Sequence, residues 1–212
     1  MLTVIGSLKG GSGKSTVTFN LALRLAAAGA SVRLFDLDPQ ATLSDAIEVR
    51  KEERYAPPLH LAAAHELGSK PAGLDLVDIG TADMDALKRA LELADRVVVP
   101  VAPSQADVWS TQRFLRIVHE ARAGRPVEIL AFINRADTHP AVRETGEAEA
   151  ALDMLRGLKR LPLRLYQRTT YRRSFSEGMA VFELEPSGKA AQEITTLASL
   201  LQPEFFSPGR SD

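Results

Sequence analysis

The 212-residue chain has no cysteine, no hydrophobic run long enough to cross a bilayer and almost no net charge. Without thiols it can form neither disulfides nor thiolate metal sites, which excludes an iron–sulfur cluster. The N-terminus has no basic segment followed by a signal-type apolar stretch, so we expect a cytoplasmic protein with no membrane partner. A formal net charge of −1 leaves nucleic-acid binding open, because a local basic patch is enough for it.

Hydrophobic residues make up 45% of the chain, which at this length is typical of one globular domain with a substantial core. We expect this domain over residues 1–202 and expect no second domain. Pro203 and Pro208 interrupt the remaining residues, 203–212, for which we expect a flexible tail.

The most informative stretch is Leu-Lys-Gly-Gly-Ser-Gly-Lys-Ser-Thr, residues 8–16, between an apolar run and an Ala/Leu-rich segment. This order predicts a strand, a glycine loop and a helix. The three glycines allow successive N–H groups to turn toward a phosphate chain, and the helix N-terminus favours anions. Lys14 adds a charge for the terminal phosphates and Ser15 a hydroxyl for Mg²⁺, so the expected ligand is a nucleoside triphosphate with magnesium.

The strict phosphate-loop motif would have glycine at position 8, where this chain has Leu8. The form present, K-G-G-x-G-K-[ST], resembles the deviant Walker-A loop of the ParA/MinD family of ATPases. The resemblance implies that Lys9 reaches across an ATP-dependent homodimer to the partner's nucleotide; the alternative is a solvated loop charge. The loop residues expected to bind nucleotide are Lys9, Gly10, Gly11, Ser12, Gly13, Lys14, Ser15 and Thr16.

A second signature, Asp36-Leu37-Asp38-Pro39-Gln40, follows a predicted strand over residues 31–35. It resembles the second motif of the same ATPases. Carried over by position, Asp38 would orient the attacking water and act with Lys9 and Lys14 as a catalytic residue, while Asp36 would support the loop or the metal shell. The alternative is an ordinary turn, in which Asp and Pro are common.

A third acidic residue, Asp78, lies at the carboxyl end of a predicted buried strand over residues 74–79. Its position matches the Walker B carboxylate, although Gly80 stands where relatives often have a Pro-Pro ending. The alternative role is to cap a helix expected from about Met84 to Ala94. The resemblance thus implies the magnesium residues Ser15, Asp36, Asp38 and Asp78.

The later elements are predicted mainly from apolar runs. Strands are expected over residues 97–101 and 127–133, and a helix follows the first of them with Asp107 as a candidate N-cap. Asn134 and Arg135 come directly after the second strand, and in relatives an asparagine there contacts the adenine edge; Asn134 is equally an ordinary loop residue. For residues 41–73 we expect one short helix and an exposed loop, and for residues 189–201 a final helix.

The one sustained charge asymmetry is the segment 156–173, which holds seven Lys and Arg residues and no Asp or Glu. Leu161, Leu163 and Leu165 alternate as in a strand, which would place Arg164 on its outer side. One interpretation is a patch for nucleic-acid phosphates and the other is an ion-paired or solvated surface. The candidate DNA-binding residues are Arg164, Arg168, Arg172 and Arg173.

The motifs occur in the family's order over nearly the whole chain. The resemblance implies a three-layer α/β sandwich with a mostly parallel twisted sheet, a P-loop NTPase fold of the deviant Walker-A type. It also implies an ATPase that uses ATP/ADP and Mg²⁺ and is closest to the small ParF-like partition proteins. Such a protein forms an ATP-dependent homodimer that binds nucleoid DNA without sequence preference. A ParB-like centromere-binding partner stimulates hydrolysis, which releases the dimer from DNA. The alternatives are a MinD-like positioning regulator, a related ligase or kinase, and a conjugation-associated ATPase with little hydrolysis.

Overall fold

The computed structural model describes residues 1–70, 73–139 and 143–207, and within them seven strands form one sheet. The strand order is β3-β2-β4-β1-β5-β6-β7, and every neighbouring pair is parallel. The strands are β1 (Leu2–Gly6), β2 (Val32–Asp36), β3 (His60–Leu61), β4 (Leu74–Ile79), β5 (Arg96–Val101), β6 (Glu128–Ala136) and β7 (Lys159–Tyr166).

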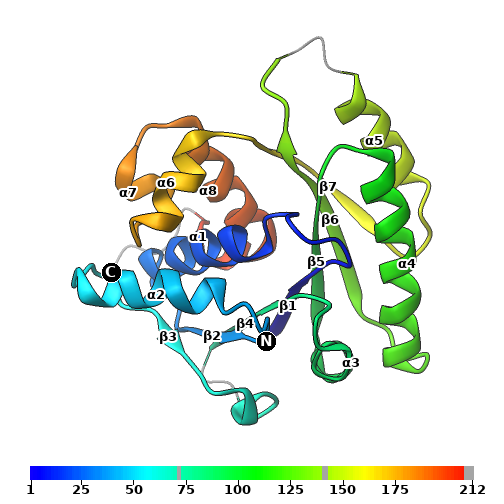
Figure 1. Ribbon diagram of the computed structural model, residues 1–212, viewed down its shortest axis with the longest axis horizontal. Coiled ribbons are helices and arrows are strands. Elements are labelled where there is room, and N and C mark those ends of the chain that lie inside the picture. Colours follow the sequence, from blue (N-terminus) through cyan, green and yellow to red (C-terminus); the bar gives the residue numbers. More distant parts are fainter. Residues whose placement is uncertain (71–72, 140–142, 208–212) are drawn as a thin grey trace.

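Helices cover both faces of this sheet (Figure 1). One layer contains α1 (Lys14–Ala27), α2 (Thr42–Glu52), α6 (Thr169–Ser176), α7 (Val181–Leu184) and α8 (Lys189–Leu201). The other contains α3 (Met84–Leu93), α4 (Gln105–Arg122) and α5 (Glu144–Asp153). The predicted three-layer α/β sandwich is confirmed.

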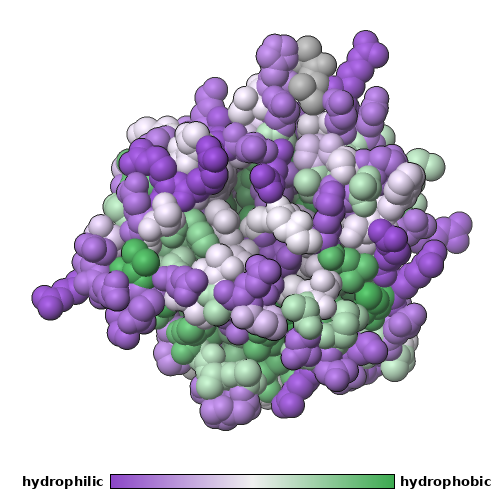
Figure 2. All heavy atoms as spheres, in the orientation of Figure 1, coloured by the Kyte–Doolittle hydropathy of each residue, from purple (hydrophilic) through white to green (hydrophobic). Residues whose placement is uncertain are grey.

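Each face of the sheet packs its own hydrophobic cluster. Phe19 of α1 and Ile194 of α8 belong to one cluster, and Phe114 of α4 and Leu152 of α5 to the other. Central strands covered on both faces have no solvent side, which explains why β5 reads as a continuous apolar run without alternation. Figure 2 shows hydrophilic side chains over much of the outer surface of these layers.

Three predicted elements are corrected. The segment 41–73 contains, besides α2, the edge strand β3 and a 3-10 helix, η1 (Ala64–Glu66). Strand β6 runs to Ala136, so Asn134 and Arg135 lie within it and not after it. The N-cap of α4 is Ser104, whose side chain accepts from the backbone N–H of Asp107, so Asp107 is not the cap.

The first part of the predicted flexible tail packs on the body of the protein. Residues 203–205 form the 3-10 helix η2 (Pro203–Phe205), and the guanidinium carbon of Arg24 lies 4.9 Å from the ring centroid of Phe206. Residues 208–212 lie outside the described residues. No helix in the described part of the chain is long and apolar enough to cross a membrane.

The parallel sheet brings the carboxyl ends of its strands to one edge. Strand β1 lies between β4 and β5, and β4 in turn lies beside β2. In register, Asp78 is the partner of Ile5 on β1 and of Asp36 on β2. The glycine loop after β1 and the acidic turns after β2 and β4 therefore meet at the same edge, where open α/β sheets bind their ligands.

Candidate functional site

The glycine loop enters α1 through left-handed backbone conformations. Gly11 and Gly13 have φ angles of 74° and 85°, a region that favours glycine. Inside the turn, the hydroxyls of Ser7 and Ser12 are hydrogen-bonded at 2.8 Å. The predicted strand, loop and helix are all present, and the loop delivers Lys14 to the first position of α1.

Lys14 is a largely buried residue whose charge interacts with the Asp78 carboxylate without forming an ion pair. Its relative exposure is 8%, and its ammonium group makes no hydrogen bond or ion pair with any described residue. Burying an unpaired charge is costly, and buried charges are normally paired or bound to an ion. At a helix N-terminus beside a glycine loop, the partner that this lysine lacks is an anion.

Asp78 is the buried counterpart on β4. Its exposure is 1%, and neither carboxylate oxygen accepts a hydrogen bond from the described part of the protein. Burial, with the charges of Asp36 and Asp38, raises the pKa of Asp78 to about 7, against the opposing effect of Ser15 and Lys14. The helix-capping alternative is wrong, because Asp83 caps α3 by accepting from the N–H groups of residues 85 and 86.

The turn after β2 uses its two acids differently. Asp36 accepts from the backbone N–H and hydroxyl of Ser44, both at 2.8 Å, and from the N–H of Asp38 at 3.2 Å, so it fixes the turn onto α2. Asp38 accepts from the N–H of Gln40 through Oδ1, at 3.0 Å. Its Oδ2 faces Gly80, where a Cβ atom would lie 2.2 Å from it. Glycine at position 80 therefore leaves the room that the Asp38 carboxylate occupies, and both residues line the same cavity.

These residues fit a magnesium ion that is bound together with a nucleotide. No group of three acidic, histidine or cysteine side chains within the described ranges forms a metal cage. Mg²⁺ in phosphate sites needs none, because it keeps several waters and takes further oxygens from the phosphates. The orphaned carboxylate of Asp78, beside Ser15, is the protein group that such a shell would satisfy.

Lys9 makes an ion pair within its own chain. Its Nζ lies 2.5 Å from Oδ2 of Asp107, the side chains being 47% and 6% exposed. The hydroxyl of Ser104 bonds to the same carboxylate oxygen. Lys9 is thus a half-exposed charge paired with Asp107, a partner that no local pattern could indicate because 98 residues separate the two. Its role at a partner's nucleotide stays a prediction.

Strand β6 holds the loop from the other side. The amide nitrogen of Asn134 donates to the carbonyl of Ser12 at 2.6 Å, and Arg135 donates to the carbonyl of Gly11 at 2.5 Å. A Cβ atom on Gly13 would lie 2.5 Å from that amide nitrogen. Asn134, which is 6% exposed, thus anchors the loop in this form; its predicted contact with adenine stays a prediction.

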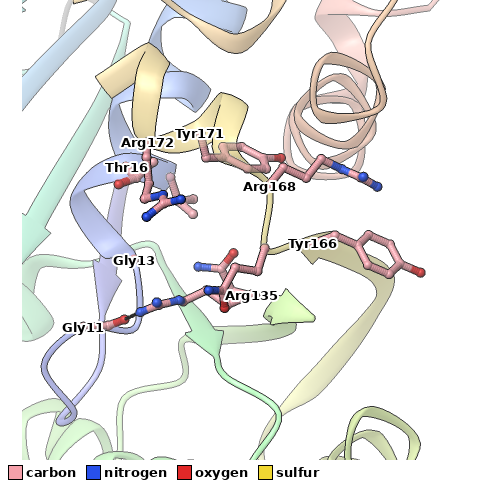
Figure 3. Close-up of a pocket in the computed structure, with 11 residues that line it drawn as sticks. Gly11, Gly13, Thr16, Arg135, Tyr166, Arg168, Tyr171 and Arg172 are labelled. Carbon is pink, nitrogen blue, oxygen red and sulfur yellow. Dashed lines mark hydrogen bonds between the residues drawn. The ribbon is translucent and has the colours of Figure 1, made fainter. Parts of the chain in front are cut away.

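Two cavities meet at the glycine loop. The phosphate-side cavity, of about 290 Å³, is lined by Lys14, Ser15, Asp38, Gly80 and their neighbours. The base-side cavity, also about 290 Å³, shares Gly11, Gly13 and Thr16 with it and extends from these residues toward Tyr166 and Tyr171 (Figure 3). Its further lining residues are Val17, Asn134, Arg135, Tyr166, Gln167, Arg168, Tyr171 and Arg172.

The arginines predicted to bind DNA do not form one free basic patch. Arg164 pairs with Glu149, Arg168 with Glu193, and Arg173 with Glu177. Arg172 has no ion pair with a described residue and lines the base-side cavity together with Arg168. The predicted alternation of β7 is confirmed, with Leu161, Leu163 and Leu165 buried. Four of the segment's seven cations form ion pairs with acids on α5, directly after α6 and on α8, namely Arg160, Arg164, Arg168 and Arg173.

Known proteins share this sequence pattern and fold. A family model described as "CobQ/CobB/MinD/ParA nucleotide binding domain" matches residues 3–181. Maintenance of carboxysome distribution protein A from Halothiobacillus neapolitanus is 28% identical over 208 residues, covering 94% of this chain and 95% of the relative.

Two solved structures show the same fold. Apo McdA from Cyanothece superposes with a TM-score of 0.77 at 20% identity, covering 97% of this chain and 99% of the other. The septum site-determining protein MinD from Pyrococcus horikoshii, complexed with Mg-ADP, gives 0.74 at 21% identity, covering 95% of each chain. With the family model spanning most of its length, the chain belongs to the CobQ/CobB/MinD/ParA family of nucleotide-binding proteins.

Proposed function

We propose that the protein is an Mg-ATP-dependent ATPase that works as a dimer-gated switch to position or partition a large cargo. The observation that carries the nucleotide part is a pair of groups at the loop: the buried Asp78 carboxylate, whose oxygens have no hydrogen-bond partner among the described residues, and the Lys14 ammonium, which forms no ion pair with them. A triphosphate would satisfy the ammonium, and its magnesium the carboxylate. The structure of the MinD relative with Mg-ADP supports the same ligand class.

Hydrolysis joins a water oxygen to the γ-phosphorus, breaks that atom's bond to the β,γ-bridging oxygen and releases a proton. The loop N–H groups and Lys14 bind the phosphates and stabilise the charge that develops on them. Asp38, through Oδ2, orients the attacking water by accepting its hydrogen bond. Bound Mg²⁺, held by Ser15 and Asp78, would neutralise charge on the phosphate oxygens.

Lys9 gives the site a dependence on a second subunit. In the single chain its ammonium is held by Asp107, so it is not free to contact a nucleotide. On the family resemblance, the ATP-bound form pairs two subunits face to face and Lys9 completes the partner's site. We infer that dimerisation exchanges the Asp107 carboxylate for the partner's phosphates.

The cargo is proposed from the relatives. One of them is named for maintaining carboxysome distribution, and the family name includes ParA. We propose that the dimer binds DNA without sequence preference and that an adaptor protein, ParB-like in its role, links it to the cargo and stimulates turnover. Plasmid or chromosome partition and the positioning of a protein-based body use this same cycle.

Light scattering and DNA retention, each measured without nucleotide, with Mg-ADP and with Mg-ATP, test the proposal. A dimer that forms and retains DNA only with Mg-ATP supports it. Lys9→Ala should keep ADP affinity within about twofold and lose the ATP-dependent dimer, because ADP binding needs only one subunit. A monomer under all three conditions, or retention on anionic vesicles in place of DNA, would contradict the proposal; the second result would favour a MinD-like regulator.

A further inference from the structure

The wall of the base-side cavity is held by a residue that does not line it. Glu193 lies on α8, and its side chain is 10% exposed. It bonds to three of the residues that do line the cavity, namely Tyr166 at the end of β7, Arg168 in the following loop and Tyr171 on α6. One carboxylate thus joins three segments of the wall to a fourth element.

Both oxygens of Glu193 are fully used. Oε1 accepts from Nε and Nη2 of Arg168 at 2.8 and 2.6 Å. Oε2 accepts from the backbone N–H of Tyr166 at 3.2 Å and from the hydroxyl of Tyr171 at 3.1 Å. Bonds to an ionised acceptor are stronger than neutral ones and impose direction, so this set fixes both the backbone after β7 and the ring of Tyr171.

The direction of the Arg168 side chain follows from the same contacts. In Figure 3 the side chains of Tyr166 and Arg168 extend away from Gly11 and Gly13. The guanidinium carbon of Arg168 lies 5.1 Å from the ring centroid of Tyr166. Glu193 and this ring therefore hold the Arg168 guanidinium away from these glycines. The lining nearer the loop combines the cations of Arg135 and Arg172 with the apolar surfaces of Val17 and Tyr171 and the amide of Asn134.

Such a lining suits a nucleotide base. A base has a flat apolar face and a polar edge, and it continues from phosphates bound at the shared glycines. We propose that Glu193 is a positioning residue for base recognition: it pre-organises the cavity wall so that the base adds affinity to that of the phosphates. This inference rests on the proposed nucleotide site and adds to it a residue on α8.

The chain contains a matched comparison. Glu149 on α5 also accepts two bonds from one arginine, Arg164 of β7, at 2.7 and 2.6 Å, one on each oxygen, and its side chain is 16% exposed. That pair lies on a different cavity, which shares Tyr166 with the base-side cavity but none of the glycine loop. Breaking it removes a carboxylate–arginine pair of similar bond lengths and burial without touching Glu193.

The experiment compares two probes, Mg-ATP and Mg-tripolyphosphate, by calorimetry on the full chain. The ratio of their affinities measures what the base and ribose contribute. Glu193→Ala should lower this ratio about tenfold, since the wall loses bonds to a charged acceptor, while tripolyphosphate affinity changes by less than about twofold. Glu193→Gln, which keeps the side-chain shape, should show a smaller loss, and Glu149→Ala none.

A second variant guards against a fold defect. Tyr171→Phe keeps the ring and removes the hydroxyl, with its 3.1 Å bond to Glu193 and its longer 3.4 Å contact to the carbonyl of Ala190. It should lower the ratio about threefold with an unchanged circular dichroism spectrum. Equal loss for both probes, or an equal effect of Glu149→Ala, would show a purely structural role and overturn the inference. A wild-type ratio near one would also overturn it but leave the phosphate site intact, whereas a wild-type chain binding neither probe would overturn the proposed function as well.

Discussion

The phosphate side and the base side of the site are built in opposite ways. On the phosphate side, the buried Asp78 carboxylate accepts no hydrogen bond and the Lys14 ammonium forms no ion pair with the described residues. On the base side, Arg168 and Tyr171 are already bonded to Glu193. Unpaired buried charge costs stability until a ligand neutralises it, whereas a satisfied wall is rigid before the ligand arrives. We therefore expect the phosphate side to change most in stability when a ligand binds, and the base side to keep the same conformation with and without ligand.

The largest effect that tests this contrast is expected for Lys14→Ala. It removes the cation that the phosphates would pair with, so affinity for both Mg-ATP and Mg-tripolyphosphate should fall by about 100-fold or more. Isothermal titration measures this, with Lys51→Ala as control because Lys51 is 73% exposed and pairs with Glu48 on the surface of α2. Unchanged ATP affinity would reject the phosphate-loop assignment.

Asp78 gives a prediction about stability and pH. Because the folded state raises its pKa to about 7, from 3.8, the folded chain binds more protons than the unfolded chain between these values. The free energy of unfolding should therefore fall as pH rises from about 4 to 7. Asp78→Asn removes this titration. Without nucleotide at pH 8, its free energy of unfolding should be a few kcal/mol higher than that of the wild type.

Urea denaturation at pH 5 and pH 8 checks the prediction. The same variant should gain less stability from Mg-ATP than the wild type, since it lacks the carboxylate for the metal shell. Asp83→Asn is the matched control, because Asn retains the N-cap of an exposed helix end. The prediction would be contradicted if the wild type became more stable between pH 5 and pH 8 by the same amount as Asp78→Asn. Asp78 would then be ionised over this whole pH range.

The next effect is expected on turnover. A Cβ atom on Gly80 would lie 2.2 Å from Oδ2 of Asp38, so Gly80→Ala should push this carboxylate out of position. ATP hydrolysis should fall about tenfold while ATP affinity stays within about threefold, because the phosphate contacts lie elsewhere. Gly146→Ala is the control, since nothing lies within 4 Å of a Cβ atom there. Unchanged turnover in Gly80→Ala would contradict the proposed role of Asp38 in orienting the attacking water.

The same contrast explains what the sequence could reveal. The phosphate side depends on short contiguous motifs, so the loop, the acidic turns and the parallel sheet were predictable from local pattern. The base side depends on contacts between distant segments: Asn134 reaches Ser12 across 122 residues and Arg168 reaches Glu193 on another element. Strand β3 has only two residues, which is too short for any periodicity to show.

The acid-free segment 156–173 shows why charge patterns along the sequence are insufficient. Its arginines looked unpaired because their partners Glu149 and Glu193 lie outside the window, on α5 and α8. In the folded structure, ion pairs offset this local excess of positive charge at four of the seven cations. Of the four candidate DNA-binding residues, Arg172 alone makes no ion pair with a described residue.

The smallest effect is therefore expected for the paired arginines in DNA retention. Removing a neutral pair, as in Glu149→Ala with Arg164→Ala, leaves the net charge unchanged and should alter retention by less than about twofold. Arg172→Ala removes an uncompensated cation and should reduce the slope of log affinity against log salt by about one. Both are measured at saturating Mg-ATP, because Arg172 also lines the base-side cavity. If removing the neutral pair abolished retention while Arg172→Ala did not, the pair would have to open on DNA, and a satisfied ion pair outside the nucleotide site would respond to a ligand as Lys14 is expected to.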